Sequence, residues 1–190
     1  MPVEQRHISS IIVGYYFVFP ISCHFAIPDP HHFMTPEELF ARWFTAPIET
    51  LSKLDSGDGA FVALMATLPL YERAIVADLK LHGQPTDDDG IKSAVETDLH
   101  IEPNVRAKFW AIFRNGFMHQ GMGLSGKTRW LISAEFSLSP EIRTEGGIDY
   151  VCLNPWDFIF HVLRKFQDTP ALITASESFP FATIMESKDT

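Results

Sequence analysis

Residues 60–83 read AFVALMATLPLYERAIVADLKLHG, the longest stretch of the chain with helical periodicity. Apolar residues recur in it at spacings of three and four, a pattern that predicts an amphipathic helix with one side buried. We expect Gly83 to end this helix and Pro69 to kink it. A long apolar helix in the first half of the chain makes a helical fold the first expectation.

Shorter helices are predicted on both sides of this segment. Thr35 is a suitable N-cap, because Pro36 and the two glutamates after it are typical of a first helical turn. Polar turns and Gly or Pro residues delimit four such helical segments, at residues 35–44, 48–54, 91–99 and 104–120.

The pattern changes from helix to strand after these segments. Residues 127–138 read KTRWLISAEFSL and place an apolar residue at every second position from Trp130 onward. Such alternation predicts a strand, and residues 148–153, IDYVCL, are predicted to return beside it. Asn154 as cap and Pro155 at the first position then predict the last long helix.

Together these segments predict a mainly α fold. We expect one helical domain at residues 34–190, with a two-stranded β-hairpin inserted at about residues 127–153. Residues 1–33 are then an N-terminal apolar extension.

The N-terminal extension leaves several interpretations open. Residues 11–27 read IIVGYYFVFPISCHFAI. At about 17 residues this stretch is at the lower limit for a membrane span, and Pro20 and His24 disfavour a span or a signal peptide. Its Ile, Val, Tyr and Phe residues suit a buried strand or an aromatic-rich extension equally well. We therefore expect no membrane partner.

The composition restricts the class of protein. Of the 190 residues, 46% are hydrophobic and 21% are charged, as in a folded domain. A net charge of -9 excludes a generally basic protein that coats nucleic acid, although a local basic site remains compatible with it. Cys23 and Cys152 are too few for a disulfide framework or a zinc cluster, which fits a reducing, cytoplasmic location. No metal and no cofactor is expected.

Residues 121–128 match the phosphate-binding loop pattern GxxxxGK[ST]. That loop requires a strand before it and a helix after it, so that backbone amides and the helix N-terminus converge on the phosphates. Here a predicted helix precedes the loop and a predicted strand follows it. We therefore interpret residues 121–128 as a helix stop and a loop.

A second motif lies near the end of the predicted helix at residues 104–120. Arg114, Asn115 and His119 follow one another within six residues of an otherwise apolar segment. Arginine pairs bidentately with phosphate oxygens, and histidine exchanges a proton near neutral pH. With an amide to orient the ring, these groups suffice for phosphodiester chemistry without a metal. A structural role is the alternative, with Arg114 as a surface cation near the helix C-terminus and His119 as a cap residue.

This motif resembles the signature of the HEPN superfamily, in which four to six residues separate an arginine, usually followed by a polar residue, from a histidine. Four residues separate Arg114 from His119. The resemblance implies a helical bundle that dimerises so that both motifs meet in one cleft. It also implies a metal-independent endoribonuclease with Arg114, Asn115 and His119 as catalytic residues, active in toxin–antitoxin systems or defence. The implied partners are RNA, a second copy and an antitoxin or regulatory protein. Some members of the superfamily only bind nucleotides or proteins, and that non-catalytic function is the alternative.

Other polar residues receive smaller roles. Glu72 and Arg73 interrupt the long apolar helix, and we predict either a substrate-binding role beside the motif or a solvent-facing position. His161 is predicted to be a satisfied core or boundary histidine. His31 and His32 are interpreted as a loop, and residues 87–89 as a solvated turn without calcium-binding spacing.

Overall fold

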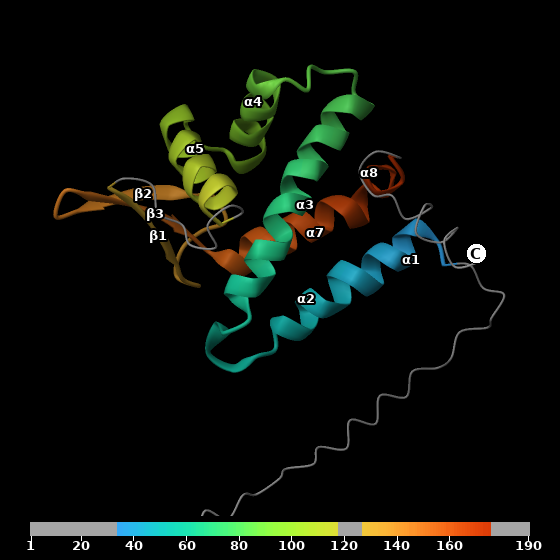
Figure 1. The fold of residues 1–190 in the computed structure, drawn as a ribbon, viewed down its shortest axis with the longest axis horizontal. Helices are drawn as coiled ribbons and strands as arrows, with labels where there is room; N and C mark the ends of the chain where they lie inside the picture. The colour runs from blue at the N-terminus through green and yellow to red at the C-terminus, as the bar shows by residue number, and fades with distance from the viewer. Residues whose placement is uncertain (1–33, 118–126, 176–190) are drawn as a thin grey trace, which may run out of the picture. The chain divides into compact units, whose positions relative to one another are not determined.

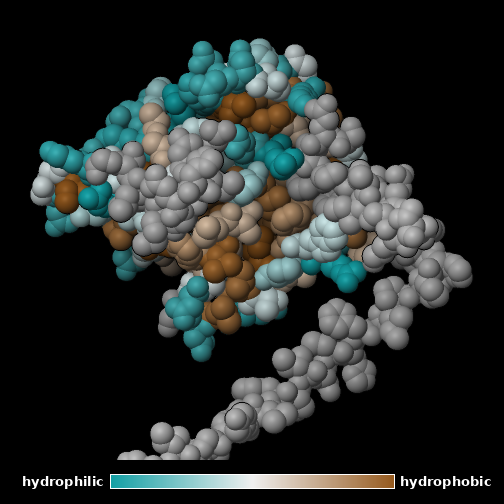
Figure 2. Space-filling view, viewed as in Figure 1, coloured by the Kyte–Doolittle hydropathy of each residue, from teal (hydrophilic) through white to brown (hydrophobic). Residues whose placement is uncertain are grey.

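The computed structural model describes residues 34–117 and 127–175, which belong to one compact unit. The predicted extension at residues 1–33 lies outside the described residues. The unit is mainly helical and carries a small sheet, as predicted (Figure 1). On the face that Figure 2 shows, both hydrophilic and hydrophobic residues reach the surface.

The first helical arm consists of α1 (Pro36–Phe40), a π-helical stretch η1 (Ala41–Thr45) and α2 (Ala46–Leu51). Its start is the predicted cap: Thr35 Oγ1 accepts a 3.2 Å hydrogen bond from the Glu38 amide, and Glu38 Oε2 accepts one of 2.8 Å from the Thr35 amide. This reciprocal pair satisfies two amides that the first turn leaves without helical partners.

Helix α3 (Ala60–Leu81) follows after the short 3₁₀ turn η2 (Asp55–Gly57) and continues through Pro69. It stops at Gly83 as predicted, where a φ of 64° suits glycine. The Gln84 amide donates to the Leu79 carbonyl at 2.8 Å and the Gly83 amide to that of Lys80 at 3.1 Å. These two bonds form a Schellman motif.

Among the described residues, only α3 is long and apolar enough to cross a membrane. In its most apolar window, 56% of the residues are buried inside the domain. The apolar side of α3 thus packs against other helices, above all α7, as in the core helix of a folded domain.

The remaining helices pack against α3 or against its neighbours. Helix α4 (Asp88–Leu99) returns along α3, and α5 (Pro103–Phe109) then passes into a second π-helical stretch, η3 (Trp110–Phe117). The prediction of a helix here is confirmed, but its second half has π rather than α geometry. Helix α7 (Pro155–Asp168) crosses α3, and the short α8 (Ala171–Thr174) contacts α1 (Figure 1). Asn154 caps α7 as predicted, since its Oδ1 accepts hydrogen bonds from the amides of Trp156 and Asp157.

The sheet corrects the prediction of a two-stranded hairpin at residues 127–153. It has three strands, β1 (Thr128–Ile132), β2 (Glu141–Glu145) and β3 (Ile148–Leu153), in the order β1-β3-β2. The hairpin joins β2 to β3, while β1 pairs with β3 in parallel. Gly146 and Gly147 have φ angles of 58° and 76°, as a tight hairpin turn between β2 and β3 requires.

Aromatic side chains join the helices in the core. Phe158 of α7 lies edge-on to Tyr71 of α3, with ring centroids 5.1 Å apart, and to Phe109 of α5, at 5.9 Å. Phe109 also contacts Phe113 of η3 at 5.1 Å. The core therefore fixes α5 and η3 against the α3–α7 pair.

Candidate functional site

The predicted catalytic motif begins on η3. Arg114 and Asn115 belong to this π-helix, and their side chains are not among the described ones, while His119 lies outside the described residues. The inner side of the same helix is fixed, because Phe109, Ile112 and Phe113 are fully buried. The backbone that carries Arg114 and Asn115 is therefore held by the domain core.

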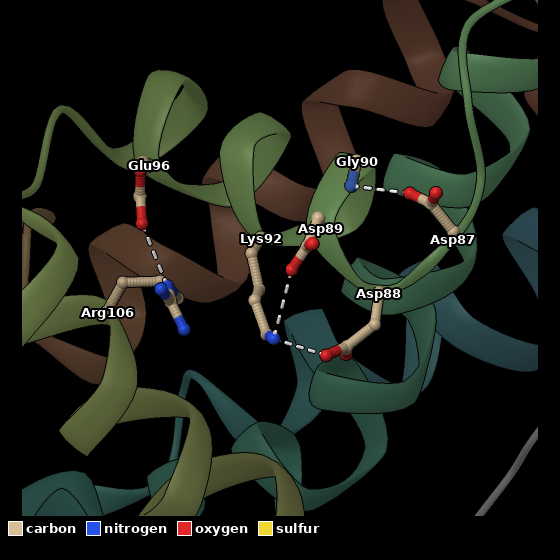
Figure 3. A network of polar contacts seen from close by, with 7 residues as sticks. All are labelled: Asp87, Asp88, Asp89, Gly90, Lys92, Glu96 and Arg106. Atoms are coloured by element: carbon tan, nitrogen blue, oxygen red, sulfur yellow. Dashed lines mark hydrogen bonds and ion pairs between the residues drawn. The ribbon is translucent and has the colours of Figure 1, made fainter.

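Two ion pairs also hold the preceding helix α5. Arg106 Nε lies 2.9 Å from Glu96 Oε1 of α4, as Figure 3 shows. Lys108 Nζ lies 2.6 Å from Asp149 Oδ2 of β3, and Thr144 donates a 2.7 Å hydrogen bond to the other oxygen of Asp149. These contacts connect α5 to α4 and to the sheet, and they compensate the charge of both α5 cations.

Glu72 and Arg73 lie on α3, where Glu72 is half-buried and Arg73 is exposed. Tyr71, directly before them, is buried in the core. Because the side chains of Arg114 and Asn115 are not among the described ones, the predicted substrate-binding role of Glu72 and Arg73 stays a prediction.

The acidic turn at residues 87–89 forms the start of α4 rather than a free loop. Asp87 is the N-cap, and its Oδ1 accepts a 2.8 Å hydrogen bond from the Gly90 amide. Lys92 contacts both Asp88 and Asp89, as Figure 3 shows. Carboxylates in a first turn also interact favourably with the helix dipole, so a structural role accounts for all three.

A polar cluster that the sequence analysis missed lies where α3, α4 and α7 meet. Asp98 Oδ2 accepts a 2.9 Å hydrogen bond from the hydroxyl of Tyr71 and one of 3.0 Å from His161 Nε2. Asp98 Oδ1 contacts the ammonium group of Lys165. The Asp98 side chain is only 13% exposed, so it is a carboxylate largely removed from water and surrounded by three donors.

These contacts change the acidity of the cluster. Burial raises the pKa of Asp98. Hydrogen bonds and charge from His161 and Lys165 lower this pKa by more than burial raises it, so the net pKa lies below the usual range. For Tyr71, burial, the negative charge of Asp98 and its hydrogen bond all raise the pKa well above the usual value. Asp98 is therefore ionised and Tyr71 is protonated at neutral pH.

The cluster borders a cleft between α3 and α4 with a volume of about 620 Å³. Asp98 and Lys165 are among the residues that line it, whereas Tyr71 and His161 contact Asp98 without being lining residues. Its size falls in the range of small-molecule sites, and a cleft beside groups with shifted pKa values is a candidate site on physical grounds.

His161 was correctly interpreted as a satisfied boundary histidine, since Asp98 is its partner. One signal for the cluster is present in the sequence: His161 and Lys165 are four positions apart and so share one side of α7. Nothing in the sequence indicates that Asp98 of α4 and Tyr71 of α3 approach that side.

Within residues 34–117 and 127–175, no group of three or more His, Cys, Asp or Glu residues is arranged to hold a metal ion. Compared with protein-family models, curated proteins and solved structures, the chain shows no match.

Proposed function

We propose that this protein is a metal-independent endoribonuclease of the HEPN type that acts as a homodimer. The observation that carries the proposal is the motif itself: Arg114 and Asn115 lie on a π-helix whose inner side is buried, and His119 follows shortly after it. π-helical stretches are rare and are frequently found at functional sites. A rigid support of this kind suits residues that must hold a substrate in one geometry.

The chemistry follows from the side chains. His119 acts as the base that takes the proton of the ribose 2′-hydroxyl, and the 2′-oxygen then attacks the phosphorus. The bond to the 5′-oxygen breaks, and this oxygen receives a proton from an acid, which is the His119 of the second motif. Arg114 holds the phosphate and the charge that develops on it, and Asn115 orients the imidazole. The products are a 2′,3′-cyclic phosphate and a 5′-hydroxyl.

A dimer is needed to bring two motifs together. Among the aromatic residues of the motif helix, Phe109 and Phe113 are fully buried in the protomer and are unavailable to a partner. The remaining aromatic residues are Trp110, which is part-buried and precedes the motif, and Phe117, which lies within the motif. The proposal assigns the dimer contact to Phe117. Phe117→Asp should convert the dimer to a monomer in light scattering and abolish cleavage, whereas Leu81→Asp, at the exposed end of α3, should do neither.

The decisive experiment incubates the purified full chain with a structured RNA, with and without EDTA. Cleavage should persist in EDTA, spare DNA and favour single-stranded loops, whose backbone adopts an in-line geometry more readily. His119→Ala and Arg114→Ala should each lower the rate by about 10²- to 10⁴-fold. His82→Ala and Arg164→Ala are matched controls outside the motif and should cleave like the unaltered protein. Activity that survives His119→Ala, or that requires a divalent metal, would remove the catalytic assignment.

A specific observation favours the alternative, a non-catalytic nucleotide-binding or protein-interaction module. The net charge is -9, and Arg106 and Lys108 of α5 are already paired with carboxylates. Fewer cations near the motif then remain for an RNA backbone. Binding of a nucleotide or protein to the motif without RNA cleavage would support this alternative. A cytoplasmic location and an antitoxin or regulatory protein as partner are parts of the ribonuclease proposal.

A further inference from the structure

The cleft between α3 and α4 has two unlike walls. The α3 wall presents Ile75 and Leu79, which are buried apolar residues. The α4 wall presents Gly90, Ala94 and Thr97, all with small side chains. Between the two helices lies a slot of about 620 Å³ that is open to solvent, and the Pro85 carbonyl lies directly against Gly90. The lining is also polar, because Asp78, Gln84 and Ser93 border the slot. A mixed lining of this kind suits a ligand with an apolar body and a few polar groups.

The floor of the slot offers one acceptor and several donors side by side. A carboxylate accepts about four hydrogen bonds. Asp98 receives three from described residues, two of them at Oδ2, so one acceptor position remains at Oδ1. The ammonium group of Lys165 has three N–H donors. It directs one of them to Asp98 in the described structure. Asp98 Oδ1 can thus accept one hydrogen bond from a ligand, and the ammonium group of Lys165 beside it can donate to the same ligand.

We propose that this slot binds a planar cyclic amide, whose N–H donates to Asp98 Oδ1 and whose adjacent carbonyl accepts from Lys165. In a cyclic amide the donor and the acceptor are neighbours on one edge and lie in the plane of the ring. That edge offers a donor to Asp98 and an acceptor to Lys165, and the apolar residues Leu79 and Ala94 line the same slot.

Charged ligands fit less well. A free anion gains from Lys165 but meets the carboxylates of Asp98 and Asp78, which both line the slot. A cation meets the ammonium group of Lys165, which is held at the floor by Asp98. A neutral ligand that both donates and accepts satisfies the two floor groups without adding charge. Uracil and guanine rings carry this edge, as do simple lactams, so the experiment includes both kinds of compound.

The test titrates the full chain with 2-pyridone and with N-methyl-2-pyridone, and follows backbone amide shifts by NMR. The expected result is a saturable shift at Gly90, Ala94 and Thr97 with 2-pyridone, and no shift at Tyr150 in the sheet. N-methylation removes the donor to Asp98 and should weaken binding about tenfold. Equal binding of both compounds, or shifts spread evenly over the domain, would overturn the proposal.

Variants separate a binding role from a structural one. Lys165→Gln should weaken 2-pyridone binding about tenfold while circular dichroism shows an intact fold. Lys92→Gln, on α4 but outside the slot, should bind like the unaltered protein. If uridine and guanosine bind more tightly than cytidine and 2-pyridone, the natural occupant is a nucleoside. If 2-pyridone binds more tightly than the nucleosides, the natural occupant is another lactam. If no cyclic amide binds at millimolar concentration, the proposal is wrong and the Asp98 cluster is only a connection between helices. RNA cleavage is unaffected by either outcome, so this test does not depend on the proposed nuclease.

Discussion

Tyr71 donates a 2.9 Å hydrogen bond to Asp98, which joins the middle of α3 to the end of α4 inside the domain. Tyr71 is 1% exposed, and its hydroxyl would otherwise be a buried donor without a partner. The same carboxylate is held by His161 and Lys165 of α7. One acidic side chain thus connects α4 to α3 and α7, the two helices that the Tyr71–Phe158 contact also joins.

Tyr71→Phe should destabilise the domain. The substitution keeps the ring, and therefore its contact with Phe158, but removes the hydroxyl that donates to Asp98. A hydrogen bond to a charged group contributes about 2 kcal/mol, so the free energy of unfolding should fall by about that amount in urea titrations. Tyr150→Phe, on β3, is the matched control and should change it by less than about 0.5 kcal/mol. A loss of equal size in both variants would show that the Asp98 contact is not its cause.

The ionisation of Asp98 predicts a stability that falls in acid. Its pKa is lower in the folded protein than in the unfolded chain, where an aspartate has a pKa of about 3.9. The stabilisation is therefore fully present above that value and is lost as the pH falls through the folded pKa.

Asp98→Asn removes this titration. The difference in unfolding free energy between the unaltered protein and Asp98→Asn should be largest near neutral pH and should narrow from about pH 5 to about pH 3. Lys165→Gln should reduce the same pH dependence, because Lys165 is one of the groups that lower the pKa of Asp98. A difference in unfolding free energy between Asp98→Asn and the unaltered protein that stays constant with pH would contradict the prediction.

Local signals explain which parts of the fold were predictable. Thr35, Asn154 and Gly83 act within a few residues of their own positions, and each one caps or stops its helix as expected. The sheet depends on distant pairing instead. In β2, only Ile142 is part-buried and the other residues are exposed, so no alternation of apolar residues marks the strand.

The candidate site residues also include some that the sequence predicts and some that it does not. The Arg114-Asn115…His119 motif is short and local, so the sequence alone reveals it. The cluster around Asp98 takes one residue from α3, one from α4 and two from α7, and apart from the four-residue spacing of the α7 pair no spacing along the chain relates them. The π geometry of η3 is equally hidden, because its apolar residues also suit an α-helix. Such features follow from how the helices pack together.

His100→Gly should stabilise the protein. His100 ends α4 with a φ of 53°, and it is the only non-glycine residue with a positive φ among the described ones. A side chain in this left-handed region costs about 1 kcal/mol that glycine avoids, while the greater freedom of glycine in the unfolded chain offsets part of the gain. We expect a net increase of about 0.5 kcal/mol in the free energy of unfolding.

His82→Gly is the matched control for this effect. His82 ends α3 with a φ of -95°, so glycine relieves no strain there, and its substitution removes the contact with Asp78. This variant should be less stable than the unaltered protein. If thermal unfolding shows that both glycine variants shift in the same direction, the conformation of His100 does not carry the cost assigned to it.

The last prediction concerns Lys127, the lysine of the apparent phosphate-binding loop. The described elements around residues 121–128 occur in the predicted order, since η3 precedes the loop and strand β1 begins at Thr128. No helix N-terminus therefore follows Lys127 to receive a phosphate, and Thr128 is the first residue of β1. Lys127→Ala should leave the binding of ATP and GTP at the level of the unaltered protein in equilibrium dialysis, with and without magnesium. Lys53→Ala, another exposed lysine, controls for nonspecific loss of charge. Tight magnesium-dependent binding that disappears only in Lys127→Ala would restore the loop as a nucleotide site and would direct the function toward a nucleotide hydrolase.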